Sequence, residues 1–366
     1  MGSARELWRA VVVGLVLAAG LAIVLVAPWQ SVAVHVGADY FVPALRGEVV
    51  TDPMQQRLVF GDGQPMFELA QDPTLARAVE TFGSPAMAAY RAQRIAVPYA
   101  AWALTLGRPA LMPAALGVLT VASAGALVAG VAVLLRRRGA PLFWAPAAVL
   151  LPGALTSIAW WGCDLPAVAA GLWGALLWTS ARPRRLAAVL LMVVAALARE
   201  NMALVPVALV LAGHGRPGLV RCSLRQASPA LLAPFVALAG WLAIVHARVG
   251  AWPWERSDGA LDLPLRGLLL AARVVQDPAV SALALAGCVA AVVLVVRWER
   301  RSWLGVLALL HAGLGVVMGE LVWESWRYFS RPLLPLLVAG LVVGIDRWAP
   351  KTAPAGVAAL PRPSTA

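Results

Sequence analysis

Residues 111–135 read LMPAALGVLTVASAGALVAGVAVLL, and Arg136, Arg137 and Arg138 follow them directly. No residue of this stretch is charged. About 20 apolar residues are enough for a helix to cross the hydrocarbon core of a bilayer. The apolar residues are continuous, whereas the strands of a membrane barrel alternate apolar and polar residues. The stretch therefore predicts a transmembrane helix that ends at a basic cluster.

The composition extends this interpretation to the whole chain. Of its 366 residues, 61% are hydrophobic and 13% are charged, against roughly 25% charged residues in soluble domains. So few charges cannot cover a water-facing surface, and the sequence predicts an all-α polytopic membrane protein. The net charge of +12 would also suit nucleic acid, but the arginines stand in short clusters between apolar runs. Such clusters determine topology, so we predict no nucleic-acid partner.

Further apolar runs bring the prediction to about ten transmembrane helices. The first run follows Arg5 and Arg9. A cleaved signal peptide is the alternative, but the run is long for one and no clear A-x-A cleavage site follows. Two short runs, 186–198 and 202–213, are interpreted as two arms around a break near the outer face. The predicted spans are 7–27, 111–135, 142–159, 165–180, 186–198, 202–213, 229–246, 278–296, 302–320 and 332–346.

The distribution of basic residues predicts the orientation of the chain. With both termini in the cytoplasm, 17 of the 30 basic residues lie on the cytoplasmic side and 15 of the 18 acidic residues lie outside. This orientation predicts a protein of the inner (plasma) membrane. Residues 1–346 are predicted to form a single transmembrane domain, and residues 347–366 a disordered cytoplasmic tail.

The longest stretch between predicted spans is 28–110, which this orientation places outside the cytoplasm. Prolines, among them Pro53, Pro65, Pro73, Pro85 and Pro98, divide it into short pieces. Within this loop, residues 66–82 predict an interfacial helix, and residues 94–107 predict a helix packed at the outer face. The chain shows no internal repeat, which disfavours the transporter folds that are built from duplicated halves.

Two carboxylates of this loop are candidate catalytic groups. Asp62 lies between Gly61 and Gly63, and glycine allows backbone turns that aim a carboxylate and let a ligand approach closely. Asp39, in the sequence Gly-Ala-Asp-Tyr, is the second candidate. The alternative interpretation of Asp62 is a solvated Asp-Gly turn.

Two pairs of arginines are candidate phosphate sites. Arg91 and Arg94 stand at i and i+3 at the start of a predicted helix, and Arg327 and Arg331 stand at i and i+4 beside the last pair of spans. Two guanidinium groups on one face suit a phosphate group. The alternative is that these arginines belong to an interfacial belt, where long basic side chains reach the headgroups.

Charged residues also interrupt the apolar region farther along the chain. Arg199 and Glu200 break the run between 186 and 213. Ionisable residues at membrane depth usually pair or line a cavity, so these two are either functional or a local ion pair that braces the break. Asp164, at the outer start of span 165–180, is either a substrate-binding group or a helix cap.

Several short motifs together resemble bacterial multi-spanning proteins of the glycosyltransferase-C (GT-C) architecture. Gly61-Asp-Gly-Gln64 is similar to their DGQ motif, and Tyr90-Arg-Ala-Gln-Arg-Ile-Ala-Val-Pro98 to their YR-x-QR-hydrophobic-P segment. Leu197-Ala-Arg-Glu200 is similar to their (T/S)-(R/K)-E break, and Arg327-Tyr-Phe-Ser-Arg-Pro-Leu-Leu-Pro335 to their C-terminal Arg-Tyr-x-x-Pro pattern. There is one departure, because Pro65 stands where an aromatic residue is usual.

The resemblance implies an inverting transferase that moves a sugar from a polyprenyl-phosphate donor to a hydroxyl of an envelope glycan or lipid. It makes Asp62 the general base, with Asp39 as the alternative or helper, and arginines the groups that stabilise the departing phosphate. A divalent cation serves some transferases of this architecture, and the resemblance leaves that question open. The substrate-binding residues it implies are Gln64, Arg91, Arg94, Asp164, Arg199, Glu200, Arg327 and Arg331.

Two other functions compete with this one. A transporter or flippase for a polar lipid or solute would spread charges through the bilayer midplane and repeat its pattern. A non-catalytic membrane scaffold would tolerate replacement of Asp62. We favour the transferase because the charges gather at the predicted outer face and the first loop is long. The cysteines lie far apart, at positions 163, 222 and 288, and no His or Cys cluster predicts a transition-metal site.

Overall fold

The computed structural model describes residues 2–24, 34–37, 40, 42–52, 56, 58–59, 61–213, 221–255 and 261–349. The candidate Asp39 and the tail beyond residue 349 lie outside these ranges. Within them the chain is mostly helical, and the sheet they contain is a pair of two-residue strands, β1 (Val34–His35) and β2 (Val49–Val50). The predicted helical fold class is confirmed at this level.

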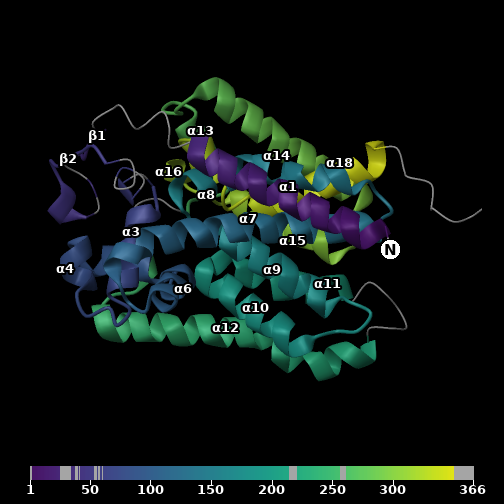
Figure 1. Cartoon of the computed structure of the whole chain (residues 1–366), viewed down its shortest axis with the longest axis horizontal. Helices are drawn as coiled ribbons and strands as arrows, with labels where there is room; N and C mark the ends of the chain where they lie inside the picture. Colours follow the sequence, from purple (N-terminus) through teal and green to yellow (C-terminus); the bar gives the residue numbers. More distant parts are fainter. Residues whose placement is uncertain are drawn as a thin grey trace, which may run out of the picture.

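A helix lies at the position of each predicted span (Figure 1). The four longest are α1 (Gly2–Val24), α7 (Met112–Arg137), α12 (Arg221–Val249) and α14 (Pro278–Trp298). Shorter apolar helices are α9 (Asp164–Trp178), α10 (Arg185–Ala198), α11 (Leu204–Gly213), α15 (Trp303–Val316) and α18 (Leu334–Trp348). The small elements are η2 (Pro43–Leu45), η3 (Pro109–Leu111), η5 (Glu200–Ala203), η6 (Pro253–Glu255), α13 (Arg266–Ala271), α16 (Glu320–Trp323) and α17 (Trp326–Phe329).

Three segments of the described chain are long and apolar enough to cross a membrane alone, namely Pro109–Arg137, Ala230–Val249 and Pro278–Trp298. A bent helix pair at 142–160 would make a fourth. Helices of 14 or 15 residues, such as α9, α10 and α15, extend about 21–23 Å, which is less than the ~30 Å hydrocarbon core. Several apolar helices thus have the character of membrane spans, and the number ten stays a prediction.

The predicted span 142–159 is not one straight helix. Residues Leu142–Leu150 form a 3-10 helix, η4, and α8 (Pro152–Trp160) follows it at an angle of 59°. Pro146 lies inside η4 and Pro152 begins α8. Proline lacks a backbone N–H group and its ring clashes with the preceding turn, so these residues prevent one continuous α-helix.

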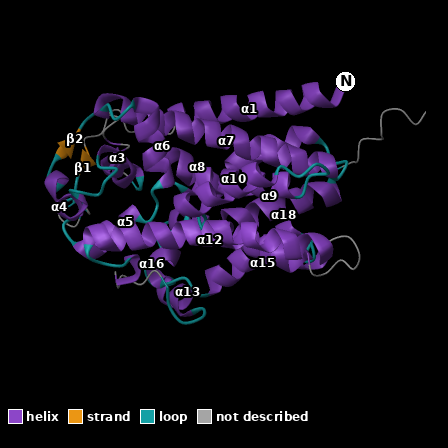
Figure 2. Ribbon diagram, turned by 90° about the horizontal axis from the view of Figure 1, so that it is seen from below, coloured by secondary structure: helices purple, strands orange, loops and turns teal. Residues whose placement is uncertain are grey.

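The first loop contains α3 (Gly63–Gln71), α4 (Ala78–Phe82), α5 (Pro85–Ala92) and α6 (Ala96–Thr105), which cover one end of the helix bundle together with β1 and β2 (Figure 2). The helix predicted over 66–82 is in fact α3 and α4. Between them the Asp72 carboxylate accepts hydrogen bonds from the backbone N–H groups of Ala76 and Arg77, at 3.0 and 2.7 Å. These bonds hold a turn that interrupts the helix. The helix predicted over 94–107 is α6, which packs on α3 and α7.

Basic clusters that the sequence assigns to one side of the membrane lie at one end of the molecule. The start of α1 and the ends of α7 and α18 are at the same end (Figure 1). There the Arg138 guanidinium pairs with Glu299 at 2.6 Å, and Arg137 donates a hydrogen bond to the Leu176 carbonyl at 3.1 Å. The shared end agrees with the predicted topology, and which compartment it faces stays a prediction.

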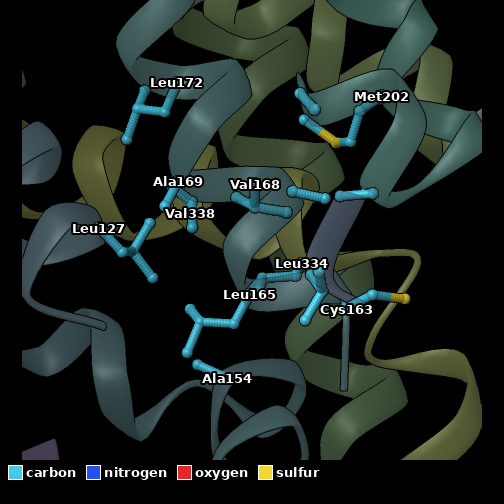
Figure 3. Close-up of a cluster of buried hydrophobic side chains, with 14 of the residues drawn as sticks. Leu127, Ala154, Cys163, Leu165, Val168, Ala169, Leu172, Met202, Leu334 and Val338 are labelled. Carbon is cyan, nitrogen blue, oxygen red and sulfur yellow. The ribbon is translucent and has the colours of Figure 1, made fainter. Parts of the chain in front are cut away.

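Small residues let the central helices pack closely. A methyl group on Gly14 of α1 would lie 2.7 Å from Val128 of α7, and one on Gly171 of α9 would lie 2.5 Å from Met202. Close approach at small residues is how helices pack in membranes. The core between α7, α8, α9 and α18 contains Leu127, Ala154, Leu165 and Val338 (Figure 3). This apolar core supports the polar residues described next.

Candidate functional site

Asp62 is buried, with 6% of its surface exposed. It precedes α3, and its backbone is positioned by Gly61, whose φ of +64° is a left-handed conformation that favours glycine. A methyl group on Gly61 would lie 2.5 Å from the ring of Trp160 at the end of α8. Pro65 falls in the first turn of α3, where proline is tolerated because its missing N–H needs no helical partner. The solvated-turn interpretation of Asp62 is therefore wrong.

Two guanidinium groups flank the Asp62 carboxylate. Arg91, in the last turn of α5, approaches its Oδ1 atom at 3.1 Å. Arg331, which follows α17, forms a short ion pair with Oδ2. The same Arg331 guanidinium lies 3.6 Å from the Asp164 carboxylate at the start of α9. Asp62 and Asp164, which are distant in sequence, thus share one arginine.

Asp164 extends the network into the break between α10 and η5. Its Oδ1 atom lies 3.2 Å from Nε of Arg199; the Asp164 side chain is buried, and 12% of the Arg199 side chain is exposed. Neither carboxylate oxygen of Asp164 makes a hydrogen bond with the described residues. Asp164 lies in the first turn of α9, where an acidic group is favourable, and it also faces Arg199 and Arg331, so both interpretations of this residue stay open.

Glu200 joins Arg199 to Arg94. Its Oε1 atom lies 4.0 Å from Nε of Arg199 and 3.1 Å from Arg94. Arg94 donates two hydrogen bonds to the Glu200 carboxylate, one to Oε1 at 3.1 Å and one to Oε2 at 3.2 Å. Seven side chains therefore form one series in which positive and negative charges alternate, which we call the ion chain: Arg94, Glu200, Arg199, Asp164, Arg331, Asp62 and Arg91.

The ion chain carries one more positive than negative charge, because it begins and ends with arginine. Burial on its own would raise the pKa of Asp62, but Arg331 and then Arg91 outweigh it and hold that pKa well below its usual range. Removing charges from water is costly, and a buried ion stays charged only when it is well paired. Glu200 is the most open member, with 36% of its side chain exposed, so a ligand can reach the series there.

The structure separates Arg91 and Arg94 from the common helix face that their spacing suggested. Arg91 lies in the last turn of α5, which ends at Ala92, and Arg94 lies beyond that helix, in the break before α6. Consequently the two guanidinium groups pair with different carboxylates, Asp62 and Glu200. They are the first and last members of the ion chain and do not form the common phosphate site that their spacing suggested.

Two further candidates lie outside the ion chain. Gln64 is buried on α3, but its amide group makes a short hydrogen bond to Glu68. Arg327 is half exposed and pairs with Asp277 at 3.7 Å. The four-residue helix α17 ends at Phe329, so Arg327 and Arg331 diverge although Arg331 still donates a hydrogen bond to the Arg327 carbonyl.

Aromatic residues that the sequence reasoning missed line the ion chain. The Tyr90 ring lies 5.4 Å from the Arg91 guanidinium and 5.1 Å from that of Arg94. Trp160 lies 5.2 Å from Arg331, a distance that suits a cation–π contact. Tyr90 was detectable because it stands next to Arg91 in the sequence. Nothing beside Trp160 in the sequence indicates its contact with Arg331, which only the fold reveals.

Two buried serines are a further omission. The hydroxyl groups of Ser157 and Ser330 have no hydrogen-bond partner among the described residues. Ser157 follows Thr156 in α8, and Ser330 precedes Arg331. A buried hydroxyl without a partner is energetically unfavourable, which makes both serines candidate ligand contacts.

An apolar groove of about 360 Å³ adjoins one end of the ion chain. It lies between α6, α7, α9 and α10, and its lining includes Val97, Pro166 and Ala198. Val97 lies three positions after Arg94, Pro166 lies two positions after Asp164, and Ala198 directly precedes Arg199. The groove is therefore next to the pairs that Arg94 and Arg199 form.

In the part of the chain that the structure describes, no three His, Cys, Asp or Glu side chains are grouped so that they could hold a metal ion. The carboxylates of the ion chain each face arginine instead.

Comparison of the chain with protein families, with curated proteins and with solved structures finds no match.

Proposed function

We propose that this protein is a membrane glycosyltransferase that moves a sugar, with inversion, from a polyprenyl-phosphate donor to a hydroxyl-bearing acceptor outside the cytoplasm. The observation that carries the proposal is the ion chain, which gathers a surplus of guanidinium groups around two buried aspartates at one end of the helix bundle. A transferase needs both a carboxylate near the acceptor and positive charge near the departing phosphate.

In the proposed reaction the acceptor oxygen forms a bond to the anomeric carbon from the side opposite the phosphate. The bond between that carbon and the phosphate oxygen breaks, and its electron pair leaves with the polyprenyl phosphate. Asp62 takes the proton of the acceptor hydroxyl. The transition state has oxocarbenium character, as in other glycoside chemistry.

The pairing of Asp62 suggests how donor binding prepares this carboxylate. In the free protein Arg91 and Arg331 hold its pKa low, which makes it a weak base. A donor phosphate bound by Arg331 competes with Asp62 for the same guanidinium group. As that ion pair weakens, the pKa of Asp62 rises toward its usual value and the carboxylate becomes a better base.

The apolar groove beside Arg94 and Arg199 supports a lipid-linked donor. It offers a hydrocarbon-like surface that extends from the ion chain. From Pro166 to Trp173 along α9, its length is about 10 Å at 1.5 Å per residue. A chain lying there would leave its phosphate group close to Arg199, which faces the same Asp164 carboxylate as Arg331.

The test is transfer of labelled sugar by the purified protein in lipid nanodiscs. A panel of radiolabelled polyprenyl-phosphate sugars is supplied with a mixture of envelope lipids and glycans as acceptors. We expect the wild-type protein to transfer label and the Asp62→Asn variant to be slower by about a hundredfold or more, since general-base catalysis contributes ~10²–10⁴-fold.

Asp262→Asn is the matched control, because Asp262 is a partly exposed aspartate that also pairs with an arginine, Arg266, and it belongs to neither the ion chain nor the grooves. It should retain transfer. Transfer that survives Asp62→Asn would move the base to Asp39. Absence of transfer from every donor, with the protein shown to be folded, would contradict the proposal and favour a transporter or a scaffold.

A further inference from the structure

A second apolar groove, which the proposed donor site does not use, follows α14. It has a volume of about 380 Å³ and lies between α8, α14 and α18. Its lining on α14 extends from Val280 to Leu294, a distance of about 21 Å at 1.5 Å per residue. One leaflet is about half of the ~30 Å hydrocarbon core, so the groove is long enough for a lipid chain.

The walls of this groove are apolar throughout. Leu283 and Val280, on its α14 side, are exposed on the surface of the molecule. Exposed leucine and valine on a long apolar helix are compatible with contact to lipid rather than to water. An occupant of the groove would therefore come from the bilayer.

The groove has a charged mouth. Trp326 lines it, and the backbone N–H of Trp326 donates a hydrogen bond to the Ser281 hydroxyl at 3.2 Å, which fixes α17 against the start of α14. The Arg327 guanidinium lies 5.6 Å from the Trp326 ring and 3.7 Å from the Asp277 carboxylate. An exposed pair of this kind contributes little to stability, so both groups can accept a ligand.

These two groups complement a particular headgroup. Arg327 can bind a phosphate, and Asp277 can accept a hydrogen bond from a hydroxyl group. The mouth also adjoins the ion chain, because Tyr328 packs against Trp160 at 5.7 Å and Arg331 donates a hydrogen bond to the Arg327 carbonyl. A headgroup held at Arg327 therefore lies beside the proposed reaction site.

We infer that the groove along α14 binds the chain of a membrane lipid whose headgroup carries a phosphate and a free hydroxyl, and that this lipid is the acceptor. The assignment as acceptor rests on the proposed function, whereas the binding does not. It narrows the acceptor from any envelope glycan or lipid to a lipid that reaches the site from the bilayer.

The experiment uses phosphatidylglycerol with a photoactivatable diazirine in one acyl chain, in nanodiscs that contain the full-length protein. After illumination, mass spectrometry locates the label. We expect label on residues 280–294 and 337–341. Gly287→Leu should reduce it severalfold, because Gly287 lines the groove and has open space around it.

Gly313→Leu is the matched control. Gly313 is also a helical glycine with open space around it, but it lies on α15 and does not line the groove. It should leave the labelling unchanged. Arg327→Gln should reduce labelling by phosphatidylglycerol, since the phosphate loses its cation.

Two results would overturn the inference: unchanged labelling in Gly287→Leu, or equal labelling by a phosphatidylcholine probe, which has a phosphate but no hydroxyl. Either result would identify ordinary surrounding lipid. Because the readout is labelling and not transfer, it is independent of the glycosyltransferase assay. Groove labelling without transfer from any donor would instead contradict the proposed function alone.

Discussion

Arg331 and Asp62, 269 positions apart in the sequence, form a buried ion pair that joins the first loop to the segment before the last helix. Each has a second partner, Asp164 for Arg331 and Arg91 for Asp62. The pair therefore links Arg91 to the rest of the ion chain, and its strength can be measured.

A double-mutant cycle on this pair should show strong coupling. Asp62→Asn leaves Arg331 and Arg91 buried without their carboxylate, which should lower the free energy of unfolding by about 3–5 kcal/mol. Arg331→Gln should also lower the free energy of unfolding. The loss in the double variant should be smaller than the sum of the two single losses, by about 0.5–3 kcal/mol. Unfolding in mixed micelles with increasing SDS measures these differences.

The exposed pair Arg327 and Asp277 serves as the reference cycle. Its coupling should be about 0–1 kcal/mol, as is usual for surface ion pairs. Equal coupling in the two cycles would mean that the Asp62 pair is not buried in the folded protein.

Stability should depend on pH through Asp62 only in acid. Its pKa in the folded protein lies below the usual value, so its contribution is complete above the unfolded pKa of about 3.9 and is lost as the pH falls through the folded pKa. The difference in unfolding free energy between wild type and Asp62→Asn should be constant from pH 6 to 8. A difference that already shrinks between pH 7 and pH 5 would show a raised pKa and refute the assignment.

Gly61→Ala should damage both stability and activity. The new methyl group would meet Trp160 at 2.5 Å in a left-handed backbone conformation, which costs about 1–3 kcal/mol for the backbone alone. If Trp160 is displaced, its ring also loses its contact with the Arg331 guanidinium, which lies 5.2 Å away. Gly47→Ala is the control, since Gly47 has a φ of +82° but open space around it. The thermal midpoint should fall more for Gly61→Ala, and transfer should fall only there.

The predicted orientation can be tested with single cysteines in a variant whose Cys163, Cys222 and Cys288 are replaced by alanine. Glu48 and Arg300 are both exposed and lie in the first loop and in the loop between α14 and α15. A membrane-impermeant maleimide added to intact cells should label a cysteine at position 48 and not one at 300. The opposite pattern would invert the topology.

Local signals in the sequence predicted the helices and many of the charged residues of the site. Arg199 and Glu200 were detectable because charge interrupts an apolar run, and such charges usually pair. The break between α3 and α4 was missed, since it depends on hydrogen bonds from the Asp72 side chain. The bend at 142–160 was missed although Pro146 and Pro152 indicate it.

The pairing of the charges could not be predicted, for a physical reason. Asp62 meets Arg331, and Arg94 meets Glu200, only when helices distant in sequence pack together. A single sequence shows which residues are charged, but the choice of partner depends on the packing of all the helices between them. The same limit applies to Arg327. Its spacing from Arg331 predicted that the two side chains share one face, whereas in the fold Arg327 pairs with Asp277.

The long separation of Asp62 and Arg331 has a consequence for biosynthesis. At roughly 5–20 residues per second, a ribosome needs on the order of 15–50 s to add the 269 residues between them. Throughout that time Asp62 has no Arg331 to pair with, and the nascent protein cannot form the complete ion chain. A product that stops short of position 331 leaves Asp62 and Asp164 without their shared guanidinium group. The site is therefore assembled only after the segment that carries Arg331, just before the last helix, has been synthesised.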